Sequence, residues 1–315
     1  MVGAARSVPV QYLALAAVWG SSFLFVELGL VGLSAVQVVL GRLLTGALTL
    51  LVVLALSRQP LPREPVVWGH LAVVAVLLCV APFLLFAWAQ EHISSGLASI
   101  YNATTPLMTM LVALAALRQE RPTPSRLAGL GAGFLGVLVV LAPWQGVQGG
   151  RLLAQAACLA ATACYGVAFV YLRRFVSPRG LGSVPVATVQ VGLAAAMMLL
   201  AAPWTARQPV DLTPTVIGGV TALGALGTGL AYVWNTNVVA GWGATTASTV
   251  TYLTPVVGVA LGVVVLAETP AWNHPVGAML VVLGIAVSQD RLAPLTRHLA
   301  GRPSPAPAAT GPRGE

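Results

Sequence analysis

Long apolar runs alternate with short polar clusters along almost the whole chain. The clusters hold most of the Arg and Pro residues, and the runs between them carry almost no charge. A helix that crosses a bilayer needs about 20 mainly apolar residues, which is roughly the length of each run. The pattern predicts an all-α membrane protein with ten transmembrane helices, near residues 9–30, 35–57, 66–89, 94–117, 125–142, 152–172, 183–203, 214–238, 244–266 and 273–289.

The first half of the chain recurs in the second half. The shared letters are Ala98-Ser99 with Ala247-Ser248 and Thr105-Pro106 with Thr254-Pro255, at a spacing of 149 residues, and Glu120 with Glu268 at a spacing of 148. Each copy holds five predicted helices, and an odd number makes the second copy cross the membrane in the opposite sense. The sequence therefore predicts two inverted five-helix repeats, which in membrane proteins usually surround a shared site.

The repeats divide the chain into five parts. We expect a cytoplasmic N-terminus at 1–8, a first five-helix repeat at 9–142, a junction at 143–151, a second repeat at 152–290 and a disordered cytoplasmic tail at 291–315. The junction is rich in glycine, as a short connection outside the bilayer should be. The tail is too poor in large apolar residues to fold.

Composition supports a membrane protein and argues against a metal site. Hydrophobic residues make up 57% of the 315 residues and charged residues 8%, and the mean hydropathy is +0.88. A soluble globule needs far more charged surface. Cys79, Cys158 and Cys164 lie inside apolar runs and show no metal-ligand spacing. We therefore expect no metal and no cofactor.

The basic residues predict the orientation in the membrane. Lysine is absent, so all sixteen basic residues are arginine. A cytoplasmic N-terminus places all of them inside except Arg151 and Arg207, which face out, and Arg42, which lies within a helix. The positive-inside rule then predicts a plasma-membrane protein with both termini in the cytoplasm. The net charge of +8 has a topological explanation and requires no nucleic acid as partner.

A glycine-rich stretch matches the pattern of a dinucleotide-binding motif. Residues 131–136 fit G-x-G-x-x-G, but they lie in a predicted membrane helix with no preceding strand. Together with Gly129 they are better interpreted as a close helix-packing face. The sequence contains no Walker A motif, serine elbow or His-Glu metal helix. We expect no catalytic site.

Three prolines indicate weak points in membrane helices. Pro106 and Pro255 occupy matching positions, and each removes the helical partner of the carbonyl one turn earlier, on Asn102 and Thr251. Freed carbonyls at membrane depth are tolerated beside another helix, a hydroxyl or a water-lined cavity. Pro82 interrupts the third helix in a similar way. These residues are interpreted as helix breaks or hinges beside a central pathway, although prolines that only kink a helix are an open alternative.

Glu27 and Arg42 are the clear charges inside the first two predicted helices. Each costs roughly 2.5–3.5 kcal/mol at a helix centre on insertion scales. Both lie at similar depths below the short turn that joins the two helices, so an ion pair between them is feasible. The pair is interpreted as a static clamp, with an outer gate whose glutamate accepts a proton as the alternative. Glu120 and Glu268, each close to a proline, are interpreted as helix-terminating residues.

These features resemble the EamA family of the drug/metabolite transporter superfamily. The resemblance is carried by the run Trp19-Gly20-Ser21-Ser22-Phe23, by the single Arg42 of the second helix, and by the block from Ala98 to Glu120 with its second copy from Ala247 to Glu268 and Gly284. It covers about residues 9–290. The resemblance implies two inverted five-helix halves around a substrate cavity, alternating access, and small organic cargo such as amino acids or related metabolites, frequently exported.

The predicted cavity lies between the first, third, fourth, sixth, eighth and ninth helices. Aromatic, hydroxyl and amide groups near the helix breaks are its expected lining: Trp19, Ser22, Tyr101, Asn102, Tyr165, Asn235, Thr251 and Tyr252. The prediction is a secondary transporter that exports a small metabolite, with proton coupling and oligomeric state left open. The alternatives are a passive channel or facilitator and, less favoured, a membrane-embedded lipid-modifying transferase.

Overall fold

The computed structural model describes residues 2–116, 123–142, 149–242 and 250–288. Within these ranges the chain consists of helices joined by short turns, and no strand is present. The prediction of an all-α protein is confirmed. The expected disordered tail, most of the junction and Glu120 lie outside the described residues.

The helices follow the predicted runs closely. Their bounds are α1 (Val2–Leu30), α2 (Ala35–Ser57), α3 (Pro65–Ala75), the π-helical η1 (Val76–Val80), α4 (Ala81–Gln90), α5 (Ser95–Asn102), α6 (Thr105–Ala116), α7 (Pro124–Leu141), α8 (Gly149–Tyr171), the π-helical η3 (Leu172–Val176), the 3₁₀ turn η4 (Ser177–Arg179), α9 (Ser183–Thr205), α10 (Pro214–Gly224), the π-helical η5 (Ala225–Leu230), α11 (Ala231–Trp242), α13 (Val250–Leu266) and α14 (Asn273–Ser288).

Most helices are long and apolar enough to cross a membrane. Among the described residues, eight helical units meet this criterion, and Leu253–Leu266 and Asn273–Val287 form two shorter apolar helices. The third unit combines α3, η1 and α4, and the eighth combines α10, η5 and the start of α11. Large apolar side chains such as Leu56, Leu200 and Val264 are exposed on their outer faces, where lipid would cover them.

Local sequence signals explain where several helices begin. Ser34 caps α2 through a capping box with Gln37, in which Ser34 N donates to Gln37 Oε1 at 2.9 Å. Thr123 and Thr213 cap α7 and α10, and a proline follows each of them at the first helical position. That proline needs no hydrogen-bond acceptor for its nitrogen and already has a helical φ.

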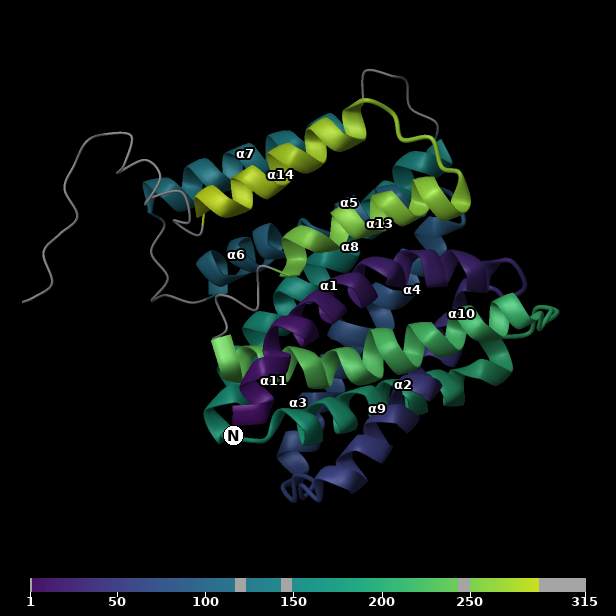
Figure 1. Cartoon of the computed structure of the whole chain (residues 1–315), viewed down its shortest axis with the longest axis vertical. Helices are drawn as coiled ribbons and strands as arrows, with labels where there is room; N and C mark the ends of the chain where they lie inside the picture. The colour runs from purple at the N-terminus through teal and green to yellow at the C-terminus, as the bar shows by residue number, and fades with distance from the viewer. Residues whose placement is uncertain (1, 117–122, 143–148, 243–249, 289–315) are drawn as a thin grey trace, which may run out of the picture.

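Helices from the two sequence copies pack against one another. α7 lies along α14 and α2 lies along α9, so each of these pairs joins matching helices of the two copies. α1 contacts α13 and α11, while α8 makes the corresponding contacts with α6 and α4. Figure 1 shows α7 and α14 along one edge, α2, α3 and α9 at the opposite edge, and α1, α8 and α13 between them.

Glycines bring α7 and α14 into close contact. A Cβ atom at Gly136 would lie 2.8 Å from the carbonyl oxygen of Gly277, and one at Gly284 would lie 2.6 Å from that of Gly129. A larger residue at these positions would push the two backbones apart. The interpretation of the glycine-rich stretch as a packing face is confirmed for Gly129 and Gly136, whereas Gly131 has open space around it.

Candidate substrate-binding site

Two π-helical segments lie at nearly equivalent places in the two halves. η1 precedes Pro82 in the third helical unit, and η5 contains Gly227 and Gly229 in the eighth. At the 148-residue spacing the two segments overlap. A π segment leaves helical carbonyls and amides with altered partners and is frequently found at functional sites. The hinge role of Pro82 stays a prediction, but the paired irregularities lie where the sequence predicts weak points.

α2 and α9 each direct one polar side chain toward the π segment of the other half. Arg42 is the eighth residue of α2, and its Nε donates to Thr228 Oγ1 of η5 at 3.0 Å. Gln190 is the eighth residue of α9, and its Nε2 lies 3.3 Å from Cys79 Sγ of η1. The two positions are 148 residues apart and therefore match in the repeat. The centre of the bundle thus holds polar groups supplied by both halves.

Aromatic rings surround the Arg42 guanidinium. Its Cζ lies 3.5 Å from the ring centroid of Phe83, which is a close cation–π contact. The phenol groups of Tyr165 and Tyr232 also lie near it. Gln190 Nε2 lies 3.3 Å from the hydroxyl oxygen of Tyr232. Tyr232 therefore connects Gln190 to the surroundings of Arg42. The cluster brings together side chains from α2, α4, α8, α9, η5 and α11.

The ion pair between Glu27 and Arg42 that the sequence makes feasible is not formed in the described structure. Glu27 lies beside Gln90, and its Oε2 is buried without a hydrogen-bond partner among the described residues. Gln90 Nε2 also donates to the carbonyl of Phe23 at 3.1 Å. Depth counted from the α1–α2 turn does not specify the direction in which a side chain leaves its helix. Glu27 faces the end of α4, whereas Arg42 faces η5.

The fourth helical unit is broken where Pro106 predicts it. α5 ends at Asn102 and α6 begins at Thr105, and Thr105 Oγ1 donates to the freed carbonyl of Asn102 at 2.7 Å. A nearby hydroxyl therefore replaces the missing amide, as membrane depth requires. The matching break at Pro255 is not found, because α13 continues through this residue as one helix. The loss of one backbone bond leaves the other bonds of α13 intact.

The remaining predicted cavity residues are distributed over the bundle. Tyr165 bridges the two largest apolar clusters and stacks on Phe86 at 6.3 Å between ring centroids. Ser22 is buried, and its hydroxyl donates to the carbonyl of Val18 at 3.0 Å. Tyr101 is 1% exposed and packs in the cluster between α5, α8 and α14, with no partner for its hydroxyl among the described residues.

Trp19 and Asn235 make no hydrogen bond or ring contact with Arg42 or Gln190 in the described part of the chain. Trp19 packs on the small apolar cluster of Leu15 and Ala231. Asn235 is partly exposed on α11. The side chains of Thr251 and Tyr252 lie outside the described residues. Of the eight predicted lining residues, the structure thus brings Tyr165 directly to the Arg42 cluster.

Sequence reasoning missed four members of this cluster: Phe83, Gln190, Thr228 and Tyr232. One signal could have found Gln190, because it lies 148 residues after Arg42 and so occupies the matching position of the repeat. The other three are ordinary residues in apolar runs. Only their contacts with Arg42 and Gln190 distinguish them.

Glu268 has a structural role at one end of the bundle. Its carboxylate accepts hydrogen bonds from Ser95 N at 2.7 Å, Ser95 Oγ at 2.7 Å and Gly96 N at 3.0 Å. These donors belong to the first turn of α5, where unpaired amides and the helix dipole favour a negative group. Glu268 therefore follows the end of its own helix α13 and also caps α5, which ties the two halves together.

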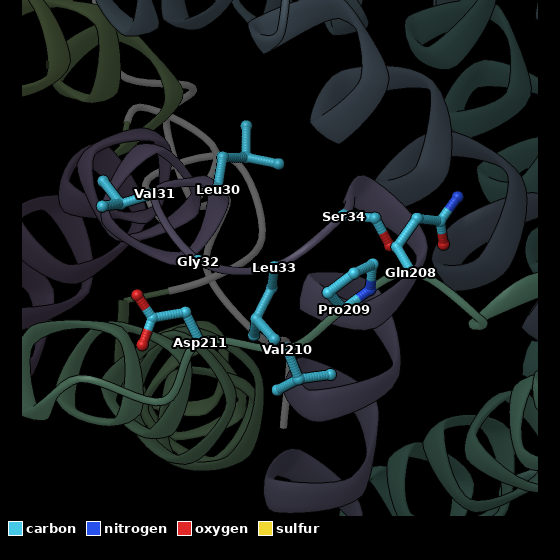
Figure 2. Close-up of a pocket in the computed structure, with 9 residues that line it drawn as sticks. All are labelled: Leu30, Val31, Gly32, Leu33, Ser34, Gln208, Pro209, Val210 and Asp211. Carbon is cyan, nitrogen blue, oxygen red and sulfur yellow. The ribbon is translucent and has the colours of Figure 1, made fainter.

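Two pockets in the described part of the chain lie away from the arginine cluster. The first has a volume of about 400 Å³ and lies between the α1–α2 turn and the α9–α10 connection, as Figure 2 shows. Asp211 N donates there to the carbonyl of Gly32 at 2.9 Å. The second, of about 390 Å³, lies between the α2–α3 and η4–α9 connections. Neither pocket is lined by a predicted cavity residue, and both are gaps between loops.

Two segments of the chain, residues 9–142 and 152–288, match the EamA-like transporter family. Together they take in most of the sequence. The chain belongs to the EamA-like transporter family. It is therefore a transporter and a multi-pass membrane protein, which confirms the resemblance seen in the sequence. Membership of a transporter family also agrees with the expectation that this EamA protein is not an enzyme.

Individual relatives of this EamA protein are more distant. A riboflavin transporter from Brucella anthropi is 31% identical over 113 residues, which cover 36% of this chain and 39% of that protein. The match thus spans about two fifths of the relative's length. A solved structure, titled only as the crystal structure of a protein, has a TM-score of 0.64 at 19% identity and covers 92% of this chain and 99% of its own. That likeness shows a shared fold.

Proposed function

We propose that the protein is a secondary transporter that exports a small organic metabolite by alternating access between two inverted five-helix halves. The observation that carries the proposal is the matched pair Arg42 and Gln190. Each bonds to the π segment of the opposite half, so polar groups from both copies meet inside the membrane. A change in the angle between the halves would move both contacts together.

The packing supports the inverted arrangement and ten crossings. Several contacts between the halves have a counterpart between the matching helices, such as α10 with α2 and α3 with α9, which is expected for two copies related by a two-fold axis. The eight long apolar units and the two shorter helices supply ten segments. The outward direction of transport rests on the family resemblance.

A cytoplasmic location for both termini also belongs to the proposal. The α2–α3 connection meets the η4–α9 connection at one end of the bundle, where Arg179 Nη1 lies 2.8 Å from Glu64 Oε2. Arg58, Arg63 and Arg174 belong to the same end. The positive-inside rule assigns this end to the cytoplasm. The α1–α2 turn and the α9–α10 connection then face outward.

Flux measurements in proteoliposomes test the proposed function. Purified full-length protein is reconstituted, and labelled amino acids, carboxylic acids, sugars, nucleosides and riboflavin are followed with and without an imposed pH gradient. Riboflavin is included because of the name of the Brucella relative. Transport predicts saturable flux of one solute class and faster exchange when unlabelled solute is present on the far side. Flux that never saturates indicates a passive channel and contradicts the proposal.

A further inference from the structure

Arg42 carries hydrogen-bond donors that the described residues do not use. A guanidinium has five N–H donors and stays charged at any physiological pH. Its Nε donates to Thr228 Oγ1, but the described part of the chain supplies no acceptor for its two terminal nitrogens and no carboxylate that pairs with it. A positive charge is thus held inside a membrane bundle with most of its hydrogen-bonding capacity unfilled.

The surroundings of Arg42 are aromatic and neutral. Phe83 covers one face of the guanidinium, and Tyr165 and Tyr232 lie near it. Gln190 is 2% exposed and is held between Cys79 and Tyr232. These groups come from both halves of the bundle. They fit a ligand with a negative end, which satisfies the arginine, and an apolar or aromatic body, which packs on the rings.

We propose that Arg42 binds the carboxylate of a monoanionic substrate whose aromatic or apolar body packs against Phe83, Tyr165 and Tyr232. The inference rests on the proposed transport function and names the substrate class for the same central site. Carboxylate and guanidinium have matching planar geometry, so two parallel hydrogen bonds form between them. The substrate carboxylate would thereby supply the counter-ion that the described residues do not give Arg42.

The charge balance favours a monocarboxylate over a phosphate or an amino acid. Arg42 is the one cation within the first two membrane-spanning segments, Val8–Leu30 and Ala35–Ser57, and the chain contains no lysine. A phosphate dianion would keep an uncompensated charge at membrane depth, which is expensive. The ammonium of an amino acid would need an acid beside Arg42, but Glu27 lies beside Gln90 instead. A carboxylic acid without an amino group fits the cluster best.

Binding to the purified full-length protein tests this inference. Phenylacetate is the probe, with phenylacetamide, phenylalanine and phenyl phosphate as matched comparisons, and ligand-induced thermal stabilisation gives the apparent Kd. We expect phenylacetate to stabilise the wild type most strongly. Arg42→Gln should weaken its binding by about 10- to 100-fold and abolish the preference for acid over amide. Arg42→Lys, which retains the charge without the planar geometry, should fall between the two.

Two further variants separate recognition from folding. Thr228→Val keeps the volume of the side chain but removes the acceptor for Arg42 Nε, and should weaken phenylacetate binding by about fivefold. Arg207→Gln makes the same chemical change at an exposed arginine and should bind as the wild type does. Each variant is first checked for an unchanged elution profile and unliganded Tm, and Arg42→Lys replaces Arg42→Gln if the latter does not fold.

The outcomes distinguish this inference from the proposed function. Equal binding of acid and amide by the wild type, stronger binding of phenyl phosphate or phenylalanine, unchanged phenylacetate affinity in Arg42→Gln, or no stabilisation by any probe would overturn the carboxylate assignment. Saturable flux of a neutral solute in both wild type and Arg42→Gln would then leave transport standing. Carboxylate binding without flux of any solute would have the opposite meaning, because it would support the Arg42 site and contradict the transport proposal.

Discussion

The two halves of the protein present different chemistry at the same position. Arg42 of α2 and Gln190 of α9 are both the eighth residues of their helices, and each contacts the π segment of the opposite half. One is a permanent cation, whereas the other is a neutral amide that the neighbouring phenol and thiol surround. Duplication thus supplies the geometry twice, while the charge is supplied once.

Because of this difference, the centre of the bundle carries one positive charge, which an exactly symmetric pair of residues would not provide. Two cations facing each other in a membrane would repel, and two amides would not attract an anion from water. In the proposed site, a single arginine beside an amide would hold one monoanion and leave the rest of the site neutral. The retained symmetry would then serve the relative movement of the two halves, and the broken symmetry would serve substrate recognition.

The largest predicted effect comes from removing the charge together with its hydrogen bonds. Arg42→Leu should lower the flux of a carboxylate substrate by about 100-fold, because truncating one partner of a buried charge pair costs about 2–5 kcal/mol. Initial rates in proteoliposomes measure this. Gln59, an exposed residue of the α2–α3 connection, offers a control, since Gln59→Leu should transport normally. Normal flux in Arg42→Leu would show that the charge at position 42 does not distinguish it functionally from position 190.

Exchanging the two residues tests whether the positions are equivalent. The double variant Arg42→Gln with Gln190→Arg returns the charge to the cluster from the opposite half. It should recover roughly tenfold of the flux lost by Arg42→Gln alone, because a charge-assisted hydrogen bond contributes about 1.5–3 kcal/mol. Recovery is measured with the same carboxylate. A double variant that is no better than Arg42→Gln would mean that the repeat does not place the two side chains in one site.

Gln190→Leu should have a smaller effect than either change at Arg42. The substitution removes a neutral amide that lies within hydrogen-bonding distance of Tyr232, and such a bond contributes about 1 kcal/mol. Flux should therefore fall by about fivefold while the preference for acid over amide is retained. Loss of that preference would show that Gln190 of α9, and not Arg42 of α2 alone, recognises the carboxylate.

Glu268→Ala should affect stability more than recognition. The variant removes three hydrogen bonds to the first turn of α5 and should cost about 1–2 kcal/mol, as the loss of a helix cap does. Thermal unfolding of the purified protein measures the loss. Since Glu268 lies at the end of α13 and outside the arginine cluster, the Kd for phenylacetate should stay within about twofold, a change well under 1 kcal/mol. A larger change in Kd would show that the Glu268 cap influences phenylacetate binding at the arginine cluster.

The apolar runs and the prolines allowed much of the fold to be predicted. Helical units appear where uncharged runs of about 20 residues occur, because lipid permits few other structures. The break at Pro106 followed from its missing amide, and the packing role of Gly129 and Gly136 followed from their small size. These properties depend on local sequence alone.

The site was less predictable because it depends on the directions of side chains. Glu27 and Arg42 face different neighbours, and hydropathy does not contain that information. Pro255 resembles Pro106 in sequence, but the helix around it continues because other contacts of α13 hold it. Gln190 was detectable from the repeat, whereas Thr228 and Phe83 required three-dimensional packing.

Labelling of Cys79 tests most directly whether the halves move around this shared centre. Cys79 lies on η1 beside Gln190 and is fully buried, and Cys158 and Cys164 can be replaced by alanine to leave it as the single thiol. A membrane-impermeant thiol reagent is added to either side of oriented vesicles, with and without phenylacetate. Alternating access predicts labelling from both sides, in a ratio that the substrate changes. Labelling from one side alone under every condition would contradict it.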